Sequence, residues 1–198
     1  MIISYSKKYV FISTPKTGSH SFFHLLKEEF DGRRLMPFHR TEVPEYTEGY
    51  TIFTTCRNPY ERFTALWHSI FFSCGTKNDP HGYRKSWMSE VGSDDPVKFA
   101  KYLVQAFREE TTPARYPQLV IPQYLWYRRM PGETKIIHIE NASEEFHKLP
   151  FVGNKRVKIP HKLKRDHQTW DDIQTPELLH WVNQWAKGDF ELLGYEKK

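Results

Sequence analysis

The sequence has few cysteines, no long apolar run and no long run of basic residues. Its two cysteines, Cys56 and Cys74, stand outside any CxxC or Cys/His spacing, which argues against a disulfide framework and a structural zinc site. The opening residues, MIISYSKKYVF, do not form the long apolar core of a signal peptide, and no stretch is apolar over transmembrane length. We therefore expect a soluble, cytoplasmic protein that has no membrane as partner.

The composition is mildly basic and rich in aromatic residues. The formal net charge of +5 suits an anionic ligand, but there is no basic arm, and the densest basic stretch is residues 155–165. We therefore expect no nucleic acid among the partners. Aromatic residues make up 16% of the chain and supply large surfaces for a core, so disorder is not expected. A length of 198 residues fits one domain over residues 1–198.

Residues 9–30 read as a buried strand, a short loop and an amphipathic helix. The apolar run YVFI predicts a strand that ends before Ser13. Beyond the loop, Phe22, Leu26 and Phe30 recur at helical spacing and predict a helix with one apolar face. This strand–loop–helix unit is the clearest local pattern in the chain.

The loop of this unit, TPKTGSHS at residues 14–21, has the composition of an anion-binding loop. Backbone N–H groups at a helix N-terminus carry partial positive charge, Gly18 lets the backbone approach a ligand, and Lys16 adds a full charge. The side-chain hydroxyls that can donate to phosphate oxygens are those of Thr17, Ser19 and Ser21. The loop therefore predicts a site for a phosphate-like group.

A second strand and helix follow in the same order. Residues 50–56, YTIFTTC, are rich in β-branched and aromatic residues, and Arg57 comes directly after them. Pro59 suits the first turn of a helix. The apolar residues that recur at helical spacing behind it are Phe63, Leu66, Trp67 and Ile70.

The remaining chain continues this alternation of strands and helices. The predicted strands are residues 35–38 and 135–140, the predicted helices are residues 96–107, 141–149 and a helix from Thr175-Pro176 to Gly188, and the predicted loops are residues 73–94 and 150–170. Strands separated by helices predict an α/β fold of three layers, in which a parallel sheet is flanked by helices. Ligands of such sheets bind beyond the carboxyl ends of the strands, so we expect Lys16 and Arg57 to converge on one ligand.

The loop at residues 14–21 differs from the nucleoside-triphosphate loop G-x-x-x-x-G-K-[ST], because its lysine precedes the glycine and the first glycine is missing. It resembles instead the 5′-phosphosulfate loop of the sulfotransferases, typically written PK(T/C)G(S/T)(T/S). Residues 56–63, CRNPYERF, resemble the 3′-phosphate motif of that family, R(D/N)PxxRxxSxY. The sequence GDFELLGY near the end of the chain is similar to an ending of the carbohydrate-type branch.

The resemblance implies a P-loop-like sulfotransferase fold and sulfuryl transfer from 3′-phosphoadenosine 5′-phosphosulfate (PAPS) to a hydroxyl or amine of an acceptor. The branch favours a carbohydrate acceptor, the donor leaves as 3′-phosphoadenosine 5′-phosphate (PAP), and no metal is required. Because the donor carries phosphates at both ends of its ribose, it requires two anion sites. The donor-binding residues that the resemblance implies are Pro15, Lys16, Thr17, Gly18, Ser19, His20, Ser21, Arg57, Arg62, Thr64, Lys164 and Arg165.

The resemblance also implies catalytic roles. Lys16 would neutralise the charge that grows on the bridging oxygen of the leaving phosphate. His39 would act as the general base, because relatives of this branch place a histidine between the two phosphate motifs, and histidine has a suitable pKa. Glu42 and Glu45 are the alternatives, since other branches use a glutamate in this region. His20 is a third option, although its position in the loop fits donor binding better.

One position departs from the family pattern. The serine expected eight residues after the arginine is Ala65 here, so one ligand of the 3′-phosphate is missing. Thr64, Ser69 or Arg62 are the substitutes that the sequence offers. The basic loop lies where relatives close a loop over the donor, and its candidate ligands of a phosphate or an anionic acceptor are Lys162, Lys164 and Arg165.

Other interpretations remain open from the sequence alone. The chain could be a P-loop-like nucleotide or nucleic-acid binding protein without transfer activity, or an ATP-dependent kinase-type phosphotransferase. Arg57 could be a solvated residue or the ion-pair partner of Glu61, and His39 an ordinary surface histidine. Trp67, Trp126 and Tyr127 could stack on a sugar or pack in the core.

Overall fold

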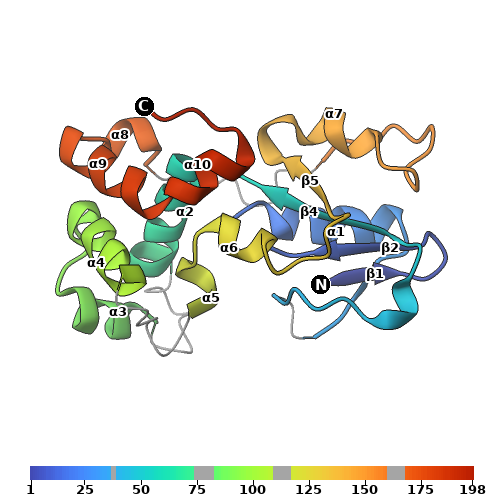
Figure 1. Ribbon diagram of the computed structural model, residues 1–198, viewed down its shortest axis with the longest axis horizontal. Coiled ribbons are helices and arrows are strands. Elements are labelled where there is room, and N and C mark those ends of the chain that lie inside the picture. Colours follow the sequence, from blue (N-terminus) through green and yellow to red (C-terminus); the bar gives the residue numbers. More distant parts are fainter. Residues whose placement is uncertain (37–38, 74–82, 109–116, 160–167) are drawn as a thin grey trace. The chain divides into compact units, whose positions relative to one another are not determined.

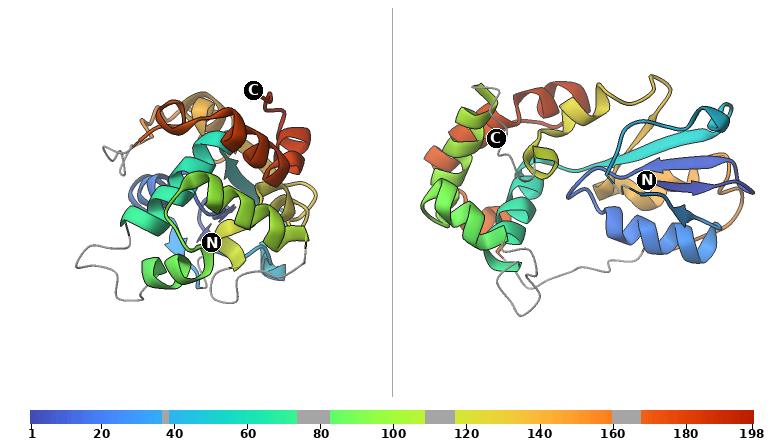
Figure 2. Two further views of the ribbon diagram at one scale, coloured as in Figure 1. Left: turned by 90° about the vertical axis from the view of Figure 1, so that its left-hand side faces the viewer. Right: turned by 90° about the horizontal axis from the view of Figure 1, so that it is seen from below.

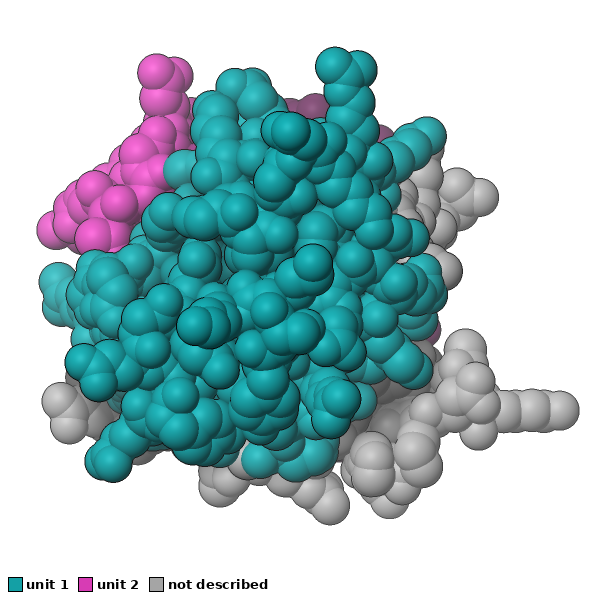
Figure 3. Space-filling model, turned by 90° about the vertical axis from the view of Figure 1, so that its right-hand side faces the viewer, with its two compact units in different colours: residues 1–57, 123–165 teal, residues 58–122, 166–198 magenta. Residues whose placement is uncertain are grey.

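The computed structural model describes residues 1–36, 39–73, 83–108, 117–159 and 168–198 (Figure 1). The chain forms two compact units, each built from two separate stretches of sequence. Unit 1 comprises residues 1–57 and 123–165, and unit 2 comprises residues 58–122 and 166–198 (Figure 3). The expectation of one domain over the whole chain is not tested by these units and stays a prediction.

Unit 1 contains a mixed five-stranded sheet with the strand order β3-β1-β2-β4-β5. The strands are β1 (Ile2–Ser4), β2 (Tyr9–Ile12), β3 (Arg33–Arg34), β4 (Thr51–Cys56) and β5 (Lys135–His138). Strands β2, β4 and β5 are parallel, whereas β1 runs antiparallel to both of its neighbours. The α/β class is therefore confirmed, but the expectation of a wholly parallel sheet was wrong. The sequence pattern missed β1, because a strand of this length shows too little alternation to be recognised.

Short and long helices accompany the sheet in unit 1. They are α1 (Ser19–Glu29), the 3-10 turns η1 (Glu45–Thr47) and η3 (Ile139–Asn141), α6 (Gln123–Tyr127) and α7 (Ala142–His147). Figures 1 and 2 show α1 running beside the strands. The strand expected at residues 35–38 is replaced by β3 two residues earlier, and residues 37–38 lie outside the described part of the chain.

The core of unit 1 lies between one face of the sheet and the helices α1 and α7. Phe11 of β2 stacks on Phe22 of α1 with 5.4 Å between ring centroids, and Phe146 of α7 lies 5.6 Å from Phe22. Phe53 of β4 contacts Phe22 and Phe146 at 6.3 and 6.2 Å. All four rings are fully buried, and burial of each contributes about 2–3 kcal/mol. This packing holds α1 and α7 against one face of the sheet.

Unit 2 is helical. Its elements are α2 (Pro59–His68), the π-helical turn η2 (Ser69–Ser73), α3 (Tyr83–Val91), α4 (Pro96–Arg108), α5 (Pro117–Val120), α8 (Trp170–Ile173), α9 (Pro176–Trp185) and α10 (Lys187–Leu193). Phe63, Phe99 and Trp185 meet in its core, with Phe63 5.7 Å from Phe99 and 6.0 Å from Trp185. Helices α2, α4 and α9 confirm the periodicity read from the sequence.

Two expectations in unit 2 were wrong. Residues 83–91 form α3 within the segment expected to be loop, where the buried Trp87 packs 5.8 Å from Phe99. Gly188 does not end the last helix, because α9 ends at Trp185 and Gly188 lies inside α10. Within the described ranges, no helix combines the length and apolarity that crossing a bilayer requires.

Candidate functional site

The candidate site lies at the carboxyl end of two neighbouring parallel strands in unit 1. Ile12, the last residue of β2, pairs with Thr54 of β4, so the loop that begins at Ser13 starts beside the end of β4. Arg57 directly follows β4. The structure therefore places the Lys16 loop and Arg57 at one edge of the sheet, as the sequence predicted, and ligands of α/β proteins bind at this kind of edge.

The loop bends sharply before α1. Lys16 and Gly18 both have left-handed backbones, with φ of 66° and 83°. Gly18 is the N-cap of α1, and its carbonyl accepts the first helical hydrogen bond from Phe22 at 3.2 Å. A Cβ atom at Gly18 would lie 2.6 Å from Cδ1 of Ile139. The left-handed backbone angle favours glycine here, and a Cβ atom would also force the end of the Ile139 side chain to move. The loop leads directly into the N–H groups of the first helical turn.

Two hydroxyls that we expected to face a ligand instead hold the loop together. Thr17 and Ser19 both donate to the carbonyl oxygen of Thr14, at 2.9 and 2.6 Å. Thr14, Thr17 and Ser19 are all buried. The loop residues with exposed surface are the partly exposed Lys16, Gly18 and Ser21 and the exposed His20, while Pro15 is buried. The groups of the loop best suited to bind an anion are therefore the N–H groups at the N-terminus of α1 and the Lys16 ammonium, rather than the hydroxyls of Thr17 and Ser19.

Paired threonines join the loop to β4. The hydroxyls of Thr17 and Thr55 are 2.9 Å apart, and because Thr17 gives its proton to Thr14, Thr55 is the donor of this pair. The hydroxyls of Thr14 and Thr54 are 3.1 Å apart, and Thr54 donates to the carbonyl oxygen of Ile12 at 2.8 Å. These buried contacts fix the Lys16 loop relative to the strand that leads to Arg57.

His39 is tied to the start of the same loop. Its Nδ1 lies 2.8 Å from the carbonyl oxygen of Ser13 and 3.2 Å from the Ser13 hydroxyl. A carbonyl oxygen only accepts, so Nδ1 carries a proton and the neutral ring has its lone pair on Nε2. The ring also lies edge-on to Trp126, with 6.4 Å between centroids. Glu42 and Glu45, the alternative bases, are both exposed.

The surroundings of His39 keep its ring neutral. Burial is the largest cause and lowers the pKa of His39 below its usual value of 6.5, while the hydrogen bond to Ser13 acts in the opposite direction. The positive charges of the N-terminal amino group, His20 and Arg34 lower the pKa of His39 further. A neutral imidazole with its lone pair on Nε2 can accept a proton at neutral pH.

Sequence reasoning missed the residue that holds the backbone of Arg57. The Arg57 N–H donates to Oε1 of Gln123 at 2.9 Å, and Nε2 of Gln123 donates to the Arg57 carbonyl at 2.8 Å. Gln123 is fully buried. From the same helix, the Tyr127 hydroxyl donates to the carbonyl oxygen of Thr55 at 3.0 Å. No local pattern marks Gln123, because the two partners are far apart in the sequence and the contact is tertiary.

Arg62 and Thr64 have structural surroundings within unit 2. Arg62 is fully buried, and its Nη2 donates to the carbonyl oxygen of Ile121 at 2.8 Å. The Arg62 guanidinium also lies 5.4 Å from the ring centroid of Trp185. The Thr64 hydroxyl donates to the carbonyl oxygen of Tyr60 at 3.0 Å within α2. These environments favour packing roles for both residues over the expected contact with a 3′-phosphate.

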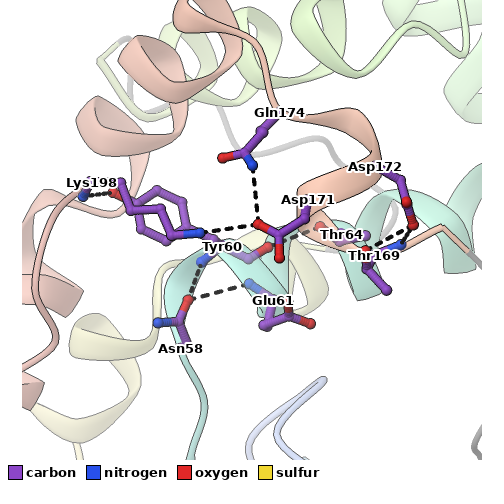
Figure 4. Close-up of polar contacts among 9 residues, drawn as sticks. All are labelled: Asn58, Tyr60, Glu61, Thr64, Thr169, Asp171, Asp172, Gln174 and Lys198. Atoms are coloured by element: carbon purple, nitrogen blue, oxygen red, sulfur yellow. Dashed lines mark hydrogen bonds and ion pairs between the residues drawn. The ribbon is translucent and has the colours of Figure 1, made fainter.

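The start of α2 is fixed by its own cap and by the end of the chain. The Asn58 side chain accepts the backbone N–H groups of Tyr60 and Glu61, at 3.0 and 3.4 Å (Figure 4). The Lys198 backbone N–H donates to the Tyr60 hydroxyl at 2.8 Å, and the Lys198 ammonium lies 3.2 Å from the Asp171 carboxylate. The asparagine and proline after Arg57 therefore serve to begin a helix, as the sequence indicated.

The remaining residues that the sequence suggested for the site have other surroundings or lie outside the described part of the chain. Lys162, Lys164 and Arg165 lie outside the described residues. Trp67 belongs to the core of unit 2, and its indole N–H donates to the Asp94 carbonyl at 2.7 Å, so core packing describes it better than stacking on a sugar. Trp126 and Tyr127 are also buried. Among the described residues, no group of three or more His, Cys, Asp or Glu side chains is arranged to hold a metal ion.

The position of the site rests on the sheet register, and its internal shape rests on buried threonines and one glutamine. Comparison with protein-family models, with curated proteins and with solved structures found no match for this chain.

Proposed function

We propose that the protein transfers a sulfuryl group from PAPS to a hydroxyl or amine of an acceptor, with a carbohydrate as the favoured acceptor class. The observation that carries the proposal is the pairing of Thr17 with Thr55, which joins the Lys16 loop to the strand that ends directly before Arg57. Two cationic elements on neighbouring strands suit a donor with phosphates at both ends of its ribose. A P-loop-like sulfotransferase fold belongs to the same proposal.

In this proposal the two cations bind different ends of the donor. The 5′-phosphosulfate lies at the N-terminus of α1, where the backbone N–H groups and Lys16 face its charge. Arg57 binds the 3′-phosphate through charge-assisted hydrogen bonds. Arg62 and Thr64 support α2 from within unit 2, so Arg57 supplies most of the affinity for the 3′-phosphate.

The reaction is an in-line displacement at sulfur. The acceptor oxygen forms a bond to sulfur while the bond between sulfur and the bridging phosphate oxygen breaks, and PAP leaves with the electron pair of that bond. Nε2 of His39 takes the acceptor proton, since Nδ1 is held by Ser13. Lys16 neutralises the charge on the leaving phosphate. Positioning and charge stabilisation supply most of the catalysis, as in phosphoryl transfer.

Calorimetric titration with PAP tests donor binding directly. We expect binding at submillimolar ligand, and Lys16→Ala and Arg57→Ala should each weaken it by about tenfold or more, because each removes a charge-assisted contact to phosphate. His39→Ala should leave PAP affinity nearly unchanged and should lower turnover by about a hundredfold or more. Absence of PAP binding, or an equal loss of affinity in all three variants, would contradict this assignment.

A nucleotide-binding protein without transfer activity is the second candidate. It is favoured by the burial of Arg62 and Thr64, which leaves fewer ligands for the donor than the family motif implies. Transfer of radiolabelled sulfate from PAPS to a panel of glycans and small alcohols separates the two. Labelled product that depends on His39 supports the transferase, and PAP binding without any labelled product supports the second candidate.

A further inference from the structure

The backbone of Arg57 is held by a side chain where a strand would otherwise hold it. The ladder between β4 and β5 ends with the pair Cys56 and His138, one residue before Arg57. Beyond that point, Gln123 accepts from the Arg57 N–H and donates to the Arg57 carbonyl, at 2.9 and 2.8 Å. The glutamine carboxamide thus makes the same pair of hydrogen bonds that an antiparallel strand residue makes.

The chemistry of this contact is specific to an amide side chain. Gln123 is fully buried and Arg57 is partly exposed, so replacing Gln123 by an apolar residue removes two part-buried hydrogen bonds to the Arg57 backbone. A carboxylate would keep the acceptor but would place a second oxygen against the Arg57 carbonyl. Tyr127, one turn further along α6, holds the preceding part of the strand at Thr55.

We infer that Gln123 is a positioning residue for Arg57, and that it sets the preference of the site for donors with a 3′-phosphate over donors without one. The inference rests on the proposed function, in which Arg57 binds the 3′-phosphate. A guanidinium binds phosphate well only when its N–H groups meet the phosphate oxygens, and its direction begins with the backbone that Gln123 holds.

Matched ligands separate this role from a general structural one. PAP and adenosine 5′-phosphate differ only in the 3′-phosphate, so the ratio of their affinities reports on the Arg57 contact alone. We expect Gln123→Met to weaken PAP binding by about tenfold and to leave adenosine 5′-phosphate binding within about twofold. In the Arg57→Ala background, Gln123→Met should cause no further change in the affinity ratio, because the two residues act as one unit.

Two further variants control for folding. Tyr127→Phe removes the hydrogen bond from α6 to Thr55, together with a longer one of 3.5 Å to Oε1 of Gln123. It leaves both hydrogen bonds between Gln123 and Arg57 in place, so it should lower the melting temperature and reduce the affinity ratio by much less than Gln123→Met does. Gln123→Asn keeps the amide but is shorter by one methylene, so it is a milder test. It should also lower the preference for PAP over adenosine 5′-phosphate, by less than Gln123→Met does.

The outcomes are distinguishable. If the unmodified protein binds PAP no better than adenosine 5′-phosphate, both the proposed function and this inference are wrong. If it prefers PAP but Gln123→Met and Gln123→Asn keep the full preference, the inference alone is wrong. An equal loss of preference in Tyr127→Phe would also overturn the inference, because it would show a general effect of loosening α6.

Discussion

The loop of the candidate site depends on a single glycine for its shape. Gly18 combines a left-handed backbone with a close neighbour, since a Cβ atom would meet the side chain of Ile139 at 2.6 Å. Gly49 has a similar φ of 76°, but a Cβ atom there would meet nothing within 4 Å. The two glycines therefore separate the cost of the backbone angle from the cost of the contact.

We predict that Gly18→Ala destabilises the protein by about 2 kcal/mol or more, whereas Gly49→Ala costs about 1 kcal/mol. Urea unfolding of the two variants measures the difference. Gly18→Ala should cost less in the Ile139→Ala background than in the unmodified protein, because the shortened side chain makes room for the added Cβ atom. Equal destabilisation at Gly18 and Gly49 would show that the contact with Ile139 is unimportant.

The lowered pKa of His39 predicts a pH dependence of stability. The folded-state pKa lies below the unfolded value of 6.5, so the unfolded chain binds a proton first as the pH falls. The contribution of neutral His39 to stability is therefore present above pH 6.5 and decreases as the pH falls below that value. Between pH 7.5 and about pH 5.5, the melting temperature should fall further in the unmodified protein than in His39→Gln. Equal falls would mean that His39 has an ordinary pKa.

At the scale of the elements, the sequence predicted the regular parts of the site and missed the tertiary ones. The run YVFI and the spacing of Phe22 and Leu26 identified β2 and α1, because one face of each packs into one core. The position of Lys16 at a helix N-terminus followed from that pattern. The inward direction of the Thr17 hydroxyl and the contact with Gln123 did not, since both depend on partners from distant segments.

The error at Gly188 shows how packing outweighs local propensity. A glycine inside a helix costs about 1 kcal/mol, which made it a reasonable end for α9. Helix α10 nevertheless continues through it and buries Phe190 and Leu193. Burial of two such side chains contributes about 3–6 kcal/mol, which exceeds the cost of the glycine.

The contact between the Lys16 loop and β4 can be tested through one hydroxyl. Thr55→Val keeps the shape of the side chain but removes the hydroxyl that bonds to Thr17, so we expect a loss of about 1–2 kcal/mol in stability and weaker PAP binding. Thr51→Val, at the other end of β4, is the control and should be nearly neutral for both. Urea unfolding and PAP titration measure the two effects. Similar results for Thr51→Val and Thr55→Val would argue against a link between loop and strand.

At the scale of the whole molecule, the Lys16 loop, Arg57, His39 and Gln123 all belong to unit 1. The chain supplies them from separate segments, so the site exists only when that unit is folded. A ligand that binds this site therefore stabilises the folded protein by mass action.

We predict that PAP at a hundredfold excess over its dissociation constant raises the stability by about 2.7 kcal/mol. Hydrogen exchange should slow at the backbone amides of residues 16–21 and at Arg57. The same concentration of adenosine 5′-phosphate should have a smaller effect. In Lys16→Ala, with tenfold weaker binding, the same concentration of PAP should stabilise the protein by only about 1.4 kcal/mol. Protection spread evenly over both units would contradict the placement of the donor.

The bond between Arg57 and Gln123 also describes a junction in the path of the chain. The polypeptide leaves unit 1 after Arg57 and returns at Gln123, and these two residues are hydrogen-bonded to each other. Residues 58–122 are an excursion from unit 1, and the hydrogen bonds between Arg57 and Gln123 join the two ends of this excursion. The entropy of closing such an excursion grows only with the logarithm of its length, by about 0.6 kcal/mol for each doubling. Residues inserted into an exposed connection of this excursion, outside the helices that form the core of unit 2, should therefore cost little, while the pair at its base keeps the strand end in place.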